Sequence, residues 1–190
     1  GGLHSTLARF FTNPITILVI YVLGLYGLYL TNVFGSLMSS HIGHIVMTTH
    51  FLVAGILLAY VAIGIDPKPT PLPFWGRMML VLAAIILHTF FAVVMMSSTT
   101  LIGATWYSQV RPPWLIDPVK DSMLGGQIAW GVGEIPTLIM MIIIAVQWAR
   151  SDERESKRRD RFTNDHGDHE LDDYNAYLTK LNELNAQAKK

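Results

Sequence analysis

Histidine and methionine recur at every third residue of the segment HIGHIVMTTHF, residues 41–51. The four positions are His41, His44, Met47 and His50. Residues three apart are neighbours on the surface of a helix, so these side chains would form one ridge. Imidazole suits copper, zinc and iron, whereas a thioether selects reduced copper. The segment is therefore a candidate metal-binding ridge.

Two further candidate ligands lie much later in the chain. His88 and Glu134 each stand within a long apolar run, where ionisable side chains usually face the interior of a helix bundle. Another helix is needed because His44 and His50 would be about 9 Å apart along a helix axis, too far to share one ion alone. Glu134 could bind the ion or orient an imidazole, and the sequence leaves both roles open. The predicted metal ligands are His44, Met47, His50, His88 and Glu134.

The sulfur chemistry available to this chain comes from methionine alone. The sequence has no cysteine and nine methionines, which excludes disulfides, thiolate metal sites and thiol catalysis. A soft metal would be held by histidine and methionine, so the pattern favours copper in its reduced state over zinc. We expect Met95 and Met96 to face lipid or to be packing residues, because methionine often fills gaps, and His41 to be a polar turn residue.

Four apolar runs dominate the first 150 residues. Apart from Arg77 at the edge of the third run, Glu134 is their only charged residue. Each run has about 20 residues, enough to cross the roughly 30 Å hydrocarbon core of a bilayer. We predict an all-α, polytopic membrane protein with a four-transmembrane-helix bundle in residues 1–150. The predicted spans are residues 14–34, 44–65, 77–98 and 127–149.

Basic residues are concentrated on one side of these predicted spans. Arg9 precedes the first run, Lys68 and Arg77 separate the second from the third, and six basic residues follow the fourth within residues 150–161. The connection over residues 35–43 carries no charge. Lysine and arginine in short connections mark the cytoplasmic side. We therefore expect a multi-pass protein of the cell membrane with both termini in the cytoplasm.

Residues 151–190 form a charged tail of different composition. Leu171, Tyr174, Leu178 and Leu181 follow one another at intervals of three and four, the pattern of an amphipathic helix. We expect this cytoplasmic helix to pack on a partner or on membrane lipid. The apolar runs contain no basic cluster or glycine-rich phosphate loop, so no nucleic-acid partner is expected.

Several segments, in their order along the chain, resemble the CtaG-type cytochrome c oxidase assembly family, some members of which are fused to a copper-resistance membrane domain. The resemblance implies a non-enzymatic factor that binds copper near the outer face and transfers it to an oxidase subunit. It matches His44, Met47 and His50 with a histidine- and methionine-rich helix, His88 with an intramembrane histidine, and Glu134 with an acidic position. The segments are LHSTLARFFTNP, SSHIGHIVMTTHFLVAGILL, GIDPKPTP, ILHTFFAVVMMSSTT, GGQIAWGVGEIPTL and VQWARSDERE.

Two departures qualify this resemblance. The family often has a further histidine near position 48, where this chain has Thr48 and Thr49. Its members also usually have earlier spans with another histidine- and methionine-rich segment, and nothing before Gly1 supplies it. The resemblance therefore implies that a membrane half on the N-terminal side could complete the copper site.

Two other functions remain open from the residues alone. A membrane electron carrier would hold a haem between two histidines at matching depth, and His50 and His88 are the candidate pair. A structural subunit of a respiratory complex would use its histidines only to satisfy interior polar groups. The sequence also leaves open whether the protein forms a homo-oligomer.

Overall fold

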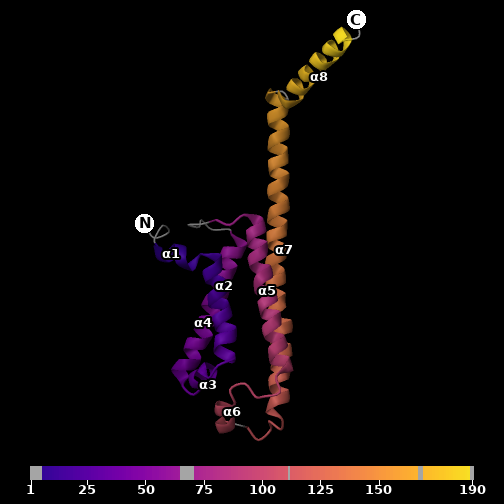
Figure 1. Ribbon diagram of the computed structural model, residues 1–190. Coiled ribbons are helices and arrows are strands. Elements are labelled where there is room, and N and C mark those ends of the chain that lie inside the picture. The colour runs from indigo at the N-terminus through magenta and orange to yellow at the C-terminus, as the bar shows by residue number, and fades with distance from the viewer. Residues whose placement is uncertain (1–5, 65–70, 111, 167–168, 189–190) are drawn as a thin grey trace. The chain divides into compact units, whose positions relative to one another are not determined.

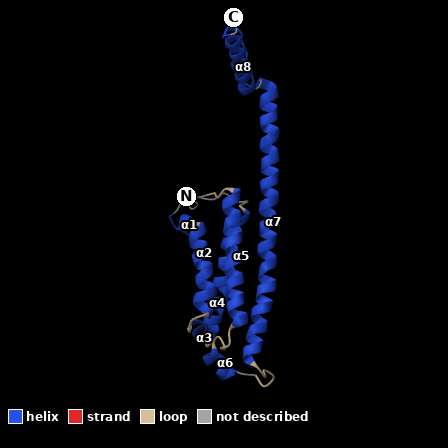
Figure 2. Ribbon diagram, turned by 45° about the vertical axis from the view of Figure 1, so that its right-hand side comes forward, coloured by secondary structure: helices blue, strands red, loops and turns tan. Residues whose placement is uncertain are grey.

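The computed structural model describes residues 6–64, 71–110, 112–166 and 169–188. Every regular element in these ranges is a helix (Figures 1 and 2), which confirms the predicted all-α class. The elements are α1 (Thr6–Phe11), α2 (Pro14–Val22), the π-helix η2 (Leu23–Gly27), α3 (Val33–Met38), α4 (His41–Ile63), α5 (Phe74–Ser97), α6 (Ala104–Val110), α7 (Pro118–His166) and α8 (His169–Ala188).

The chain divides into two compact units, residues 1–146 and residues 147–190. Helices α1 to α6 and the first part of α7 belong to the first unit. The second unit contains the rest of α7 and all of α8. All candidate metal ligands lie in the first unit, so that unit carries the site.

Three described helices are long and apolar enough to cross a membrane: α4, α5 and the described part of α7. The first expected span, residues 14–34, is instead a shorter apolar helix, Pro14–Gly27, followed by a turn. Polar side chains make this turn, because the Thr31 hydroxyl donates to the Gly27 carbonyl and accepts from the Val33 amide. Such local hydrogen bonds compete with helix continuation. The four-span count therefore stays a prediction.

The long helices begin earlier than the apolar runs suggested. Helix α4 starts at His41, so this residue, expected in a turn, lies within the helix. The Ser40 hydroxyl caps α4 by accepting from the Gly43 amide at 2.9 Å. Asp117 caps α7 in the same way, by accepting from the Val119 and Lys120 amides. Helix α7 then continues through Pro136. The capping residues thus extend the helices beyond their hydrophobic segments.

The core of the first unit is aliphatic and joins four helices, and α2, α4 and α5 lie side by side in it (Figure 1). Small residues such as Ala62 and Ala84 are fully buried and allow close helix approach. The outward faces are also apolar: Ile56, Phe90 and Leu138 are 58%, 62% and 58% exposed. A bundle whose surface is as apolar as its core fits a lipid environment. The buried core residues are Ile17, Leu58, Val61, Ala62, Leu80, Val81, Ala84, Met140 and Ile144.

Arg77 joins the end of α4 to the start of α5. It is 7% exposed, its Nη1 donates to the Ile63 carbonyl at 2.7 Å, and its guanidinium lies 4.3 Å from the Phe74 ring centroid. Gly64 ends α4 with a φ of 70° beside this guanidinium. Arg77, which was counted among the charges that mark the cytoplasmic side, therefore caps a helix C-terminus. Lys68, the other basic residue of that connection, lies outside the described residues. The orientation of the termini stays a prediction.

Replacement of Arg77 by methionine should lower the free energy of unfolding by about 1–3 kcal/mol, because the half-buried Ile63 carbonyl loses its donor. Thermal unfolding in detergent measures this effect. Arg9→Met is the matched control, because Arg9 is exposed in α1. Equal unfolding temperatures for the two variants would contradict the capping role.

Candidate metal site between two helices

An imidazole and a carboxylate from different helices meet inside the first unit. His88 of α5 and Glu134 of α7 are 4.0 Å apart, measured from Nδ1 to Oε1, and their side chains are 13% and 30% exposed. The Thr89 hydroxyl donates to the same Glu134 oxygen at 2.8 Å. Glu134 is thus held by α5 and faces the imidazole at a distance longer than a hydrogen bond. A small movement of either side chain would let the carboxylate orient the imidazole, as carboxylates do for metal-binding histidines.

Gly133 allows α7 to approach the His88 ring. A Cβ atom at this position would overlap the imidazole, with Cε1 as its nearest atom and Nε2 at 2.8 Å. Only a residue without a side chain leaves room for the ring here. The adjacent Glu134 is therefore fixed at the same level as His88 by backbone packing as well as by Thr89.

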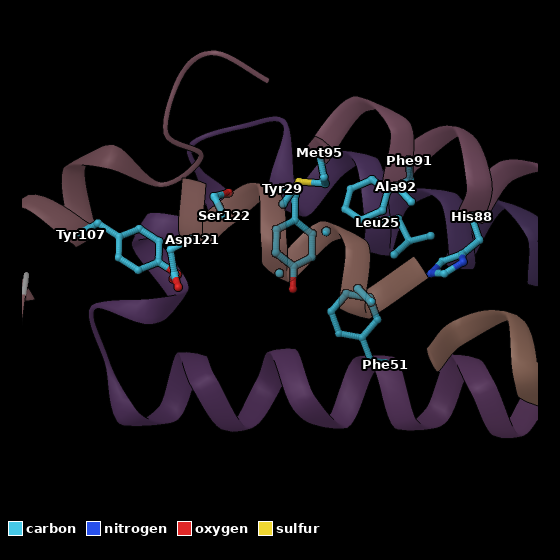
Figure 3. Close-up of a pocket in the computed structure, with 13 residues that line it drawn as sticks. Leu25, Tyr29, Phe51, His88, Phe91, Ala92, Met95, Tyr107, Asp121 and Ser122 are labelled. Atoms are coloured by element: carbon cyan, nitrogen blue, oxygen red, sulfur yellow. The ribbon is translucent and has the colours of Figure 1, made fainter. Parts of the chain in front are cut away.

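His88 also lines a cavity of about 410 Å³. Figure 3 shows His88 at one end of it, Tyr107 and Asp121 at the other, and Met95 and Tyr29 between them. Most of the wall is apolar or aromatic, with a few polar groups, as in many binding cavities. The lining residues are Leu25, Tyr29, Phe51, His88, Phe91, Ala92, Met95, Tyr107, Asp121, Ser122, Gly125, Gly126 and Ala129.

The ligands predicted on α4 lie elsewhere. His44 is exposed, Met47 is half-buried, and neither lines the His88 cavity. His50 lines a separate cavity with Phe11 and Ile20, and its Nε2 is buried without a hydrogen-bond partner. That nitrogen lies 2.5 Å from where a Cβ atom would stand on Gly24 of the π-helix η2.

The structure therefore brings together only part of the predicted ligand set. His88 and Glu134 meet, whereas His50 packs against η2. In the part of the chain that the structure describes, no group of three or more His, Asp or Glu residues could hold a metal ion. His50 and His88 also pack on different helices, His50 against Gly24 of η2 and His88 against Gly133 of α7.

Comparison with known proteins identifies the family. A model described as the cytochrome c oxidase caa3 assembly factor, Caa3_CtaG, matches residues 1–151. This range includes both His88 and Glu134 and ends within α7. The chain belongs to the Caa3_CtaG family. The family is one of assembly factors, and no catalytic family is indicated.

Mycobacterial proteins are similar to this Caa3_CtaG chain over almost its whole length. An uncharacterized protein of Mycobacterium bovis and one of Mycobacterium tuberculosis are each 40% identical to it over 183 residues. A third, from Mycobacterium leprae, is 37% identical. Each alignment covers 96% of this chain and 28% of the relative, so the chain spans little more than a quarter of the curated relatives it matches. No solved structure gives a significant match.

Met95 lines the His88 cavity of this Caa3_CtaG chain. The sequence alone did not predict this role for it. It lies seven residues after His88, which is close to two helical turns and places both on one face of α5. Both methionines lie beside Gly126, and Met96 is not among the described residues that line the cavity. The spacing of seven was the available signal, and the sequence did not say which face meets a cavity.

The other end of the cavity is polar. Tyr107 of α6 stacks near Phe34 at a centroid distance of 6.4 Å, and Asp121 is exposed in the first turn of α7. Burial raises the pKa of Tyr107, and the negative charge of Asp121 raises it further. Tyr107 thus presents a neutral phenol beside a carboxylate.

Proposed function

We propose that this membrane protein takes part in cytochrome c oxidase assembly by binding reduced copper and passing it to an oxidase subunit. Membership of the Caa3_CtaG family supports the assembly role. One observation of this chain carries the copper assignment: His88 and Met95 line the same cavity, with Glu134 beside the imidazole. The two residues lie about 10 Å apart along the α5 axis, so they offer the ion two successive positions in that cavity. Copper is the cargo in this proposal, and no reaction is catalysed.

The chemistry of these three side chains fits the cargo. Imidazole and thioether together favour reduced copper over zinc, calcium or magnesium. Charge also favours it, because a carboxylate and a monovalent cation sum to zero, and net charge inside a bilayer is costly. Glu134 would either orient His88 or bind the ion itself. A site with so few ligands permits their stepwise replacement by those of an acceptor.

The α4 ridge has a second place in this proposal. His44, Met47 and His50 would hold copper near the outer face, before or after it occupies the His88 site. The buried Nε2 of His50 has no hydrogen-bond partner, and a buried polar atom of this kind requires an explanation. Copper coordination, completed by a partner or another part of a longer protein, would provide one.

Paired methionine variants test the copper assignment. Met95→Leu should weaken the binding of reduced copper about tenfold or more, because a thioether ligand is lost while side-chain volume is nearly kept. Met96→Leu makes the same change beside the cavity wall and should bind as the wild type does. Competition with a soluble chelator of reduced copper measures both affinities. Equal affinities, or a haem absorption band in the purified protein, would contradict the proposal.

A further inference from the structure

The cavity that ends at His88 is much larger than a single ion requires. Its volume of about 410 Å³ would hold on the order of ten water molecules at roughly 30 Å³ each. It extends from Tyr107, Asp121 and Ser122 to His88 (Figure 3). A site that only stores copper needs space beside its ligands, whereas this space continues along α5 and α7 to a polar end.

We propose that this cavity is the passage by which copper reaches His88, with Asp121 attracting the cation at the polar end and Met95 receiving it on the way. The inference rests on the proposed function and adds a route to it. Neither Asp121 nor Met95 was among the predicted ligands. The three groups follow one another along the cavity: an exposed carboxylate, a half-buried thioether, and an imidazole beside Glu134.

The charges at the polar end favour cations. Among the residues that the structure describes, Asp121 is the only charged one in the cavity lining. Nearby Lys120 lies 3.7 Å from Asp117, which balances its charge. A concave surface lined by one sign of charge focuses the electric field and increases the rate at which oppositely charged ions arrive. Asp121 is thus placed to raise the local concentration of cations.

The middle of the passage is suited to a soft cation. Tyr29 and Phe91 lie in its wall with ring centroids 5.4 Å apart, and Met95 stands beside them in Figure 3. The faces of aromatic rings attract cations, and a thioether binds reduced copper directly. An ion moving inward from Asp121 would therefore meet favourable contacts before it reaches His88.

Uptake kinetics test the passage separately from the site. The rate at which purified protein in detergent removes reduced copper from a soluble chelator should fall about threefold or more in Asp121→Asn at low ionic strength. The difference should shrink near 1 M salt, where the screening length is about 3 Å. The final copper content should be unchanged. Asp152→Asn, which changes net charge equally at an exposed residue outside the cavity, should take up copper at the wild-type rate.

A second pair of variants tests the path itself. Ala129→Phe adds a large side chain in the cavity wall and should slow uptake at every salt concentration. Ala145→Phe makes the same change at an exposed residue of α7 outside the cavity and should leave the rate unchanged. The passage is wrong if wild type binds copper but either Asp121→Asn or Ala129→Phe takes it up at the wild-type rate. If wild type binds no copper, the proposed function fails with it.

Discussion

Replacement of His88 by leucine is expected to reduce the affinity for reduced copper by more than about a hundredfold. Among the described residues, the substitution removes the only imidazole in the cavity lining. Removing a residue that only orients a metal ligand lowers metal affinity about 10–100-fold. Removing the ligand itself should lower the affinity further. Chelator competition on the purified protein measures the change.

Matched variants separate coordination from folding in this experiment. His41→Ala removes an exposed imidazole at the start of α4 and should leave copper affinity unchanged. Glu134→Gln keeps an oxygen for the Thr89 hydroxyl but removes the charge beside His88, and should weaken binding about 10–100-fold. Wild-type affinity in His88→Leu, with loss of copper in a His44→Ala/His50→Ala variant, would move the principal site to the α4 ridge.

Replacement of Gly43 by alanine is expected to be the most destabilising small substitution in α4. A Cβ atom at this position would overlap the backbone of Leu37, including its carbonyl oxygen. Backbone atoms cannot move aside as a flexible side chain can, so α3 and α4 would have to separate. Overpacking costs about 1–3 kcal/mol, and we expect the upper end of that range. Thermal unfolding in detergent provides the measurement.

Gly55 supplies the control on the same helix. A Cβ atom there meets nothing within 4 Å, so Gly55→Ala should leave the unfolding free energy unchanged or raise it by about 0.5–1 kcal/mol, since glycine weakens a helix interior. A Gly43→Ala variant as stable as Gly55→Ala would show that the α3 and α4 backbones are not in tight contact.

The long helices could be predicted because charge-free runs of about 20 residues indicate spans. Their ends were less predictable, since hydrophobicity does not report capping. Capped by Ser40, α4 begins at residue 41, three residues before its expected span. Capped by Asp117, α7 begins at residue 118, nine residues before its expected span. The first run was read as one span because its apolar composition hides the turn at Thr31. The three long helices are confirmed as candidate spans, and the fourth stays a prediction.

The candidate site was predictable only in part, for a geometric reason. Intramembrane position alone distinguished His88 and Glu134, and the structure places them 4.0 Å apart. Helical spacing grouped His44, Met47 and His50 on a ridge, but spacing within one helix does not say which neighbour that ridge faces. The contacts of His50 with Gly24 and of His88 with Gly133 depend on how different helices pack. The same limit concealed Met95.

The most direct test of the account is X-ray absorption at the copper edge of the purified protein loaded with one equivalent of reduced copper. The account predicts imidazole nitrogen from copper at His88 and thioether sulfur from copper at Met95, two positions of the ion along one cavity, with the sulfur signal lost in Met95→Leu and kept in Met96→Leu. It also predicts that His88→Leu holds much less copper than the wild type. A copper environment without sulfur, or one that is the same in wild type, Met95→Leu and His88→Leu, would contradict the central claim that copper binds between α5 and α7.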